Sequence, residues 1–125
     1  MAEFVYEDLS FKINGIAFEI YKTLGGDLKE KVYAEAFAEL LERDGIPFRR
    51  EVYYPVRINN KTIGKNYFDF IVYEKIVLEL KRGSANYIQA CKQLADYLKL
   101  SGLKLGLIIR FTKDGAKVKR IVNIT

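Results

Sequence analysis

Residues 67–81 read YFDFIVYEKIVLELK, and the expected fold is built around them. The stretch contains two apolar runs, rich in β-branched and aromatic residues, which predict strands over residues 62–73 and 76–81. Asp69 interrupts the first run, and Glu79 and Lys81 interrupt the second. Because a charged side chain in a buried strand costs free energy unless a partner compensates it, these three residues indicate a site.

The relative placement of Asp69 and Glu79 depends on the turn between the two strands. Side chains alternate along a strand, so Glu79 and Lys81 share one face. In an antiparallel hairpin with a three-residue loop at residues 73–75, Asp69 lies directly opposite Glu79. A two-residue loop instead pairs Asp69 with Leu80 and moves the two carboxylates to opposite faces. Both registers are compatible with the sequence.

Two carboxylates side by side would repel each other, and a divalent cation relieves this repulsion. Mg²⁺ takes few carboxylates, a backbone carbonyl and several waters as ligands. Lys81, on the same face as Glu79, would then hold or activate an attacking water, or neutralise charge that builds up on a phosphate. The alternative is an ion-paired patch of Glu79 and Lys81, with or without Asp69, on an exposed sheet face.

Outside this stretch, the hydrophobic pattern predicts three helices and three more strands. Apolar residues at three- and four-residue steps indicate helices over residues 8–24, 27–44 and 85–100. Apolar and β-branched runs indicate strands over residues 48–58, 104–111 and 117–124. The resulting order, α-α-β-β-β-α-β-β, is an α/β fold (α+β mixed) with a mixed central β-sheet flanked by helices. The helical connection between residues 81 and 104 is long enough for a crossover, which makes the strands on either side of it parallel.

Capping residues set the expected helix boundaries. Asp8 is the expected N-cap of the first helix, and Gly25–Gly26 end that helix. Asp27 is expected to cap the second helix, which Gly45 ends. The apolar stripe of the third helix is expected to contain Ile88, Cys91, Leu94, Ala95 and Leu98.

Two helices carry polar side chains in informative positions. Glu30 lies in line with Phe37 and Leu41, on the apolar stripe that should face the sheet. Its alternative role is at the start of the helix, as a capping-box partner or a favourable dipole charge. Gln93 and Tyr97 are four residues apart and share a helix face, where they would bond a phosphate or a metal-bound group. Their alternative role is that of a polar pair at the flank of the helix.

The composition narrows the available chemistry. Of 125 residues, 50% are hydrophobic and 14% are aromatic, enough for one domain with a buried core. The absence of histidine excludes catalysis by imidazole and typical zinc sites, which leaves carboxylates, lysines, hydroxyls and hard metal ions. No apolar run approaches the roughly 18 residues of a membrane span, and the first residues lack a signal-peptide pattern. With a single cysteine, Cys91, we expect a cytoplasmic protein with no membrane partner.

The charge is unevenly distributed along the chain. The formal net charge is +5, but residues 1–51 carry eleven acids and seven bases, a net charge of −4. Residues 52–125 carry five acids and fourteen bases, a net charge of +9. A basic half suits a polyanionic partner such as nucleic acid. The alternative is a solvated surface that keeps the protein soluble.

These residues resemble a known nuclease pattern. Asp69 followed by Glu79-Leu80-Lys81 is similar to the motif of the PD-(D/E)xK nuclease superfamily, and residues 93–97 (QLADY) are similar to the Q-x3-Y helix signature of several of its branches. More closely, residues 8–123 resemble the GxxExxY protein family, a PD-(D/E)xK-like group of prokaryotic proteins. The similar segments are residues 16–25 (IAFEIYKTLG), 30–33 (EKVY), 45–48 (GIPF), 67–69 (YFD), 76–81 (IVLELK) and 93–108 (QLADYLKLSGLKLGLI).

The resemblance implies a fold and a metal. It implies a restriction-endonuclease-like core in a single domain over residues 1–125, in which Asp69 and Glu79 bind Mg²⁺, replaceable by Mn²⁺, with the backbone carbonyl of Leu80 nearby. Two positions depart from the family pattern. Asp27 replaces the first glycine of the name motif, and Phe68 replaces the proline that precedes the superfamily's aspartate. Neither departure removes a candidate metal ligand.

The resemblance also implies roles for four further side chains. Lys81 would be the catalytic lysine, and Glu30 would orient water or a second metal. Gln93 and Tyr97 would support the site or contact the substrate.

The leading hypothesis is therefore a Mg²⁺-dependent nuclease, a hydrolase that cleaves phosphodiester bonds of nucleic acid, with DNA as the expected substrate. The first alternative is a catalytically silent nuclease-like fold that binds nucleic acid or a partner protein. A second alternative is an antitoxin-like or structural scaffold. Because the chain leaves little room for a separate target-reading domain, we expect a homodimer or a partner protein to choose the substrate.

Overall fold

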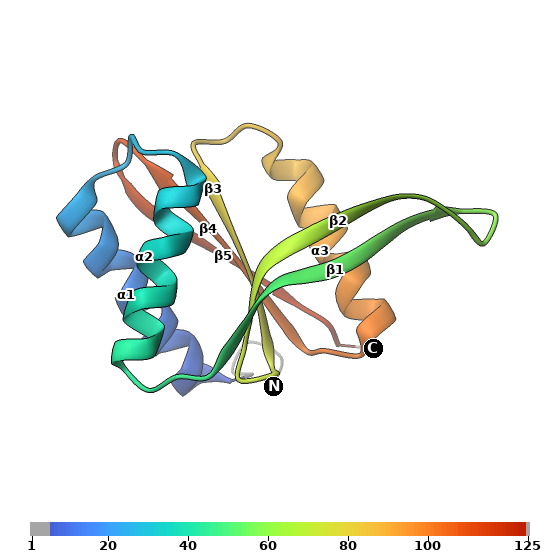
Figure 1. Ribbon diagram of the computed structural model, residues 1–125, viewed down its shortest axis with the longest axis horizontal. Coiled ribbons are helices and arrows are strands. Elements are labelled where there is room, and N and C mark those ends of the chain that lie inside the picture. The colour runs from blue at the N-terminus through green and yellow to red at the C-terminus, as the bar shows by residue number, and fades with distance from the viewer. Residues whose placement is uncertain (1–5, 125) are drawn as a thin grey trace.

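The computed structural model describes residues 6–124, which form three helices and five strands. In chain order these are α1 (Glu7–Leu24), α2 (Glu30–Arg43), β1 (Phe48–Ile58), β2 (Lys61–Val72), β3 (Ile76–Arg82), α3 (Tyr87–Ser101), β4 (Leu105–Thr112) and β5 (Gly115–Val122). This order and the flanked mixed sheet confirm the expected α/β fold. Figure 1 shows α1 and α2 together on one side of the strands and α3 on the other.

The five strands form one mixed sheet in the order β1-β2-β3-β4-β5. β3 and β4 run parallel, whereas the other neighbouring pairs are antiparallel. The crossover through α3 therefore joins parallel strands, as its length predicted. β1 and β2 are joined by the two-residue turn Asn59–Asn60, whose positive φ angles (50° and 63°) suit the twist of a hairpin.

An apolar cluster on each face of the sheet holds the helices in place. The first cluster packs α1 and α2 against the strands, with Ile16, Phe37 and Leu80 among its buried members. The second packs α3 through Leu94 and Leu98. Full burial of one such side chain contributes about 1.5–3 kcal/mol, so the two clusters fix the layers between which the polar residues lie. No helix within residues 6–124 is both long and apolar enough to cross a bilayer.

The β1–β2 hairpin changes faces near its middle. Phe70 belongs to the cluster under α1 and α2, whereas Phe68, two residues earlier on β2, belongs to the cluster under α3. The change occurs between the register pairs Arg50↔Phe70 and Val52↔Phe68. Glu51 lies between these pairs with a left-handed φ of 57°. The outer half of the hairpin thereby parts from β3 and reaches across α3 (Figure 1).

The starts of both N-terminal helices differ from the prediction. The N-cap of α1 is Tyr6 in place of Asp8, which lies in the first turn of the helix. α2 begins at Glu30, and its N-cap is Lys29 in place of Asp27. For α2 the reason is the side chain of Tyr33, six residues after Asp27.

The loop before α2 is held from within the helix itself. The Tyr33 hydroxyl donates to the Gly25 carbonyl at 2.6 Å and accepts the Leu28 N–H at 3.1 Å. Gly26 lies so close to β4 that an added Cβ would meet the Thr112 carbonyl oxygen at 1.9 Å. These contacts hold residues 25–29 outside the helix, so a cap at Asp27 does not form.

The buried stripe of α3 also differs from the predicted one. Its buried residues are Ala90, Leu94 and Leu98, spaced four apart. Ile88 is 66% exposed because it lies about 200° around the helix from Ala90. Cys91 is half-buried at the edge of the second cluster. The predicted helical period is confirmed, but the predicted apolar stripe is rotated about the helix axis relative to the stripe that is buried.

Candidate active site

The loop between β2 and β3 has three residues, Tyr73–Lys75. The register pairs Phe70↔Leu78 and Val72↔Ile76 place Asp69 and Glu79 at the next opposed positions. Of the two registers compatible with the sequence, the one that brings the two carboxylates together is therefore the one the chain adopts. β2 pairs with β3 over three residues only, so Asp69 lies where the two strands part.

Two backbone donors at the parting of β2 and β3 are taken up by the carboxylates. The Asp69 N–H donates to Glu79 Oε1 at 3.2 Å. The Leu80 N–H donates to Asp69 Oδ2 at 2.7 Å. A buried N–H without an acceptor is costly, so the carboxylates replace the ladder hydrogen bonds that end here. The same contacts hold both acids at one end of the β2–β3 pairing.

Lys81 lies on the same face of β3 as Glu79. Its Nζ is 3.8 Å from Glu79 Oε2, and the two side chains are only 19% and 13% exposed. The pair is therefore mostly withdrawn from solvent, unlike an ion-paired patch on an open sheet face. Burial strengthens the electrostatic coupling between these groups.

The two carboxyl groups are destabilised in their charged forms. Burial, followed by the nearby charge of Asp69, raises the pKa of Glu79 to about 9. Burial also raises the pKa of Asp69, while its hydrogen bonds with Glu79 and Leu80 oppose the rise. The ammonium group of Lys81 lowers both pKa values but does not offset burial. Such a pair is short of positive charge, which is the electrostatic condition for binding a cation.

Glu30 reaches the far end of the same strand from α2. Its side chain is exposed, yet Oε2 accepts the N–H of Arg82, the residue after Lys81, at 3.0 Å. The Glu30 charge also raises the pKa of Asp69, as a minor cause. The predicted alignment is confirmed, because Ala34, Phe37 and Leu41 are the buried stripe of α2 and Glu30 reaches β3 from the same side. Its side chain stays exposed because it lies on the first turn of the helix. No capping-box hydrogen bond forms, since the N-cap Lys29 has no side-chain cap.

Gln93 and Tyr97 occupy different surroundings, although both lie on α3. Gln93 Oε1 accepts Asn66 Nδ2–H from β2 at 2.9 Å. Asn66 and Gln93 line a small polar pocket of about 160 Å³ together with Lys81. Tyr97 lies one turn further on and packs its ring against Phe68, with a centroid distance of 5.2 Å. The structure thus brings Gln93 to the side of Lys81 and Tyr97 into an aromatic cluster beneath the hairpin.

Sequence reasoning missed three carboxamides beside Lys81. Asn66, Asn86 and Gln89 line the same polar pocket as Gln93. Asn86 precedes α3 with a left-handed φ of 58°, and no periodic pattern marks such a position. Asn66 carried no clear signal, because it follows Lys65 in the polar outer half of β2.

The oxygen donors at this site suit a hard cation. Two adjacent carboxylates are a donor set that Mg²⁺ accepts, with waters and a backbone carbonyl completing the shell. Within residues 6–124 no three histidine, cysteine or acidic side chains are grouped closely enough to hold a metal ion. Glu30 therefore belongs to the surroundings of the carboxylate pair, and a metal held here would have two acidic ligands.

The chain has recognisable similarity to known proteins. A family model described as the PD-(D/E)XK nuclease superfamily matches residues 7–121. The crystal structure of SSO0001 is similar with a TM-score of 0.56 and 21% sequence identity, over 74% of this chain and 49% of that one. The crystal structure of an alkaline exonuclease (LHK-Exo) from Laribacter hongkongensis has a TM-score of 0.49 and 13% identity, over 88% of this chain and 68% of that one. No curated protein matches the chain.

These similarities differ in what they show. The family model covers nearly all of the described residues. The likeness to SSO0001 is one of fold, and the chain spans about half the length of that protein.

Proposed function

The chain belongs to the PD-(D/E)XK nuclease superfamily, and on that premise we propose that it is a metal-dependent nuclease that hydrolyses phosphodiester bonds of DNA. The observation that supports this proposal is the pair of buried carboxylates, Asp69 and Glu79, joined to Lys81 at the parting of β2 and β3. We further propose that the chain belongs to the GxxExxY branch. Glu30 and Tyr33 support this assignment, since one reaches the end of β3 and the other ties down the loop before α2.

We propose that Asp69 and Glu79 hold Mg²⁺, with the carbonyl of Leu80 as a further ligand and Mn²⁺ as a substitute metal. When bound, the cation supplies positive charge that polarises the phosphate and stabilises the departing oxygen. The raised pKa values of both carboxyls support the proposal. Burial is their main cause, and a divalent cation would stabilise the charged forms that burial disfavours.

The other side chains are assigned by their positions around this pair. Lys81 would hold the attacking water or the phosphate oxygens, because its ammonium group lies beside Glu79 and reaches the polar pocket. Glu30 would orient a water near the end of β3. Gln93 would steady the substrate side of the site through Asn66, and Tyr97 would support the hairpin that carries Asn66.

Nucleic acid is the proposed partner because its charge matches that of the chain. Residues 52–125 carry a net charge of +9, and this half contains β2, β3 and α3. Binding that relies on such charges weakens steeply as salt increases. Choice of substrate would depend on a second copy of the chain or on a partner protein, and the proposed location is the cytoplasm.

A direct test measures Mn²⁺ binding by calorimetry and cleavage of single-stranded, duplex and plasmid DNA with Mg²⁺. We expect one Mn²⁺ to bind the parent protein and Glu79→Gln to lose that binding and all cleavage. Glu74→Gln is the matched control, because Glu74 lies in the loop between β2 and β3 and forms an exposed ion pair with Arg49. Exposed pairs of this kind contribute little to stability, so this variant should behave like the parent.

Two outcomes would contradict the proposal. Unchanged cleavage in Glu79→Gln would exclude the assigned metal ligands. Salt-sensitive DNA binding with no dependence on metal or on Glu79 would identify a binding module with a nuclease-like fold.

A further inference from the structure

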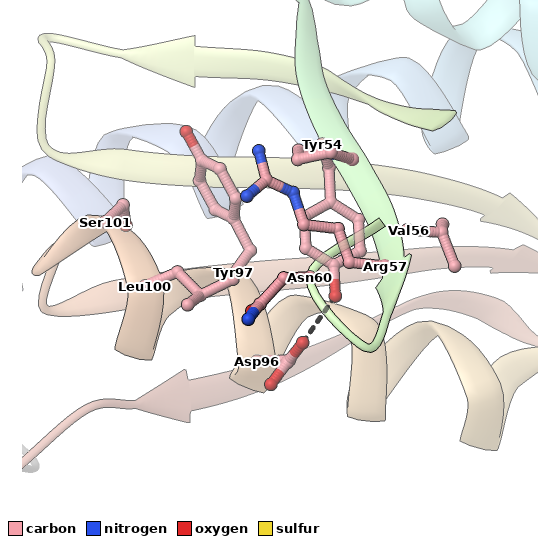
Figure 2. A pocket seen from close by; sticks show the side chains of 9 residues that line it. Tyr54, Val56, Arg57, Asn60, Asp96, Tyr97, Leu100 and Ser101 are labelled. Carbon is pink, nitrogen blue, oxygen red and sulfur yellow. Dashed lines mark hydrogen bonds between the residues drawn. The ribbon is translucent and has the colours of Figure 1, made fainter. Parts of the chain in front are cut away.

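Outside the carboxylate site, a pocket between the β1–β2 hairpin and α3 combines aromatic, amide, acidic and cationic side chains. Its volume is about 530 Å³, within the range of about 300–1,000 Å³ typical of ligand sites. Figure 2 shows that hairpin side chains converge there with side chains from the last turns of α3. The lining includes Tyr54, Arg57, Asn60, Asp96, Tyr97 and Leu100.

The walls of this pocket are aromatic and firmly held. Tyr54 is 7% exposed, and its ring meets that of Tyr97 edge-on, with a centroid distance of 5.9 Å. The Tyr54 hydroxyl donates to Asp96 Oδ2 at 2.5 Å, across the gap between β1 and α3. At the rim, Leu100 is 72% exposed.

Two contacts link the walls of this pocket to the proposed active site. Tyr54 is the register partner of Asn66 on β2, and Asn66 is hydrogen-bonded to Gln93, which lines the polar pocket beside Lys81. Along α3, seven residues separate Gln93 from Leu100, a rise of about 10 Å. This distance corresponds to about three nucleotides at the spacing of a duplex strand, 3.4 Å, and to fewer in a stretched strand.

We propose that this pocket binds an unpaired nucleobase of the substrate, about two or three nucleotides from the bond that is cleaved. The proposal rests on the proposed nuclease function and names its substrate class: nucleic acid with a single-stranded end or overhang. Aromatic side chains combined with a cationic group are the general means of holding single strands. A base in a duplex must first be flipped out before it can enter such a pocket, at a cost of a few kcal/mol.

Asp96 favours a base over a phosphate as the occupant. One of its oxygens accepts the Tyr54 hydroxyl, and within residues 6–124 the other has no hydrogen-bond partner. That oxygen is free to accept an N–H group from a base edge, whereas it would repel a phosphate. Arg57, which lies on β1 like Tyr54, is placed to contact the phosphate of the nucleotide whose base lies inside the pocket.

The test compares binding of fluorescein-labelled duplexes with and without a four-nucleotide overhang, on either the 3′ or the 5′ strand. Fluorescence anisotropy of the full chain in EDTA gives Kd values without cleavage. We expect one overhang to bind about tenfold or more tightly than the blunt duplex, because stacking of one base on aromatic side chains supplies such a factor. Replacing a single overhang nucleotide by an abasic site should remove this preference.

Leu100→Glu is the informative variant, since it adds a negative charge at the rim without disturbing the buried core. It should lose the preference for the overhang and retain the binding of blunt duplex to within the effect of one charge. Phe11→Glu is the matched control: Phe11 is 78% exposed on α1, on the other side of the sheet, and should keep the preference.

Failure of the pocket and failure of the nuclease function give different results. If the parent protein cleaves DNA but binds blunt and overhanging duplexes equally, the pocket does not hold a base and the nuclease function stands. If the preference exists but survives both the abasic site and Leu100→Glu, the unpaired strand binds elsewhere and the pocket is left to a peptide partner. If the parent protein neither binds nor cleaves DNA, both proposals fall together.

Discussion

Gly106 on β4 lies directly beneath Leu94 on α3. A Cβ added to Gly106 would lie 2.7 Å from Leu94 Cδ2, closer than two such carbons can approach. Leu94 is fully buried. The missing side chain on β4 therefore sets how closely α3 approaches the sheet. It thereby also sets the position of Gln93, the residue before Leu94, relative to Lys81.

Gly106→Ala is expected to destabilise the protein by about 1–3 kcal/mol, because the added methyl group overpacks the contact with Leu94. Leu94→Ala alone should cost about 2–5 kcal/mol by leaving a cavity. In the double variant the new methyl group enters that cavity, so the combined loss should be smaller than the sum of the two single losses. Urea unfolding of the four proteins measures this coupling, and strictly additive losses would mean that the two residues do not determine the helix position.

Asp69→Asn should reduce metal-dependent cleavage by about 100-fold or more, because it removes one of two charged ligands. The fold should survive, since an asparagine oxygen can still accept the Leu80 N–H that Asp69 accepts at 2.7 Å. Initial rates of plasmid nicking and circular dichroism provide the two measurements. Asp114→Asn, in the exposed turn before β5, is the control and should leave the rate unchanged. Full activity in Asp69→Asn would refute the proposed mechanism.

Glu79→Gln should stabilise the metal-free protein increasingly as pH rises. Burial and the charge of Asp69 raise the pKa of Glu79 to about 9, from 4.5. A carboxyl whose pKa rises on folding supports the folded state fully below the unfolded value, and this support is lost as pH rises toward 9. Glutamine does not titrate, so the variant should gain at least about 1 kcal/mol over the parent between about pH 5 and pH 8.

Urea unfolding in EDTA at several pH values measures this gain. Glu74→Gln serves as the control, because the exposed guanidinium of Arg49 lowers the pKa of Glu74 and so reverses the sign of any small effect. A stability difference between Glu79→Gln and the parent that does not vary with pH would show that Glu79 is charged in the folded protein throughout.

Lys81→Met should separate metal binding from catalysis. The Lys81 ammonium group lies 3.8 Å from Glu79 and supplies no metal ligand, so affinity for Mn²⁺ should change by less than about tenfold. Cleavage should fall by about 100-fold or more, since the charge that faces the developing phosphate charge is lost. Calorimetry and cleavage rates are compared with those of Lys22→Met, an exposed lysine in the last turn of α1. Equal losses of binding and cleavage would instead assign Lys81 a role in organising the carboxylates.

Local sequence patterns were sufficient to predict most of the fold. The alternation and composition of residues 48–58 predicted β1 with both of its bounds, and the position of the Asn59–Asn60 turn followed from turn chemistry. The crossover through α3 and the parallel pairing of β3 with β4 followed from the length of the connection. These features depend on the conformational preferences of short segments and on the lengths of the connections, both of which can be read directly from the sequence.

Helix starts and buried faces were less predictable because side-chain contacts and tertiary packing override the preference of a single residue. Asp27 has good capping chemistry, but the Tyr33 hydroxyl holds the preceding loop in another conformation. Ile88 fits the apolar period of α3, yet the direction from which β4 meets the helix leaves it in solvent. The sequence alone was therefore compatible with more than one N-cap for α2 and with more than one buried face for α3.

For the candidate site, residue types and spacing were enough to nominate Asp69, Glu79 and Lys81 and to state the register under which the acids would meet. Only the tertiary structure decided that they meet. The three-residue loop places the two acids opposite each other, and the pairing of β2 with β3 ends at Phe70, next to Asp69. Two backbone N–H groups are thereby left for the carboxylates to accept. Of the pocket between Tyr54 and Tyr97, the sequence singled out Tyr97 alone. The pocket exists because the hairpin changes faces at Glu51, where an ordinary alternating pattern continues while the strand itself turns over α3.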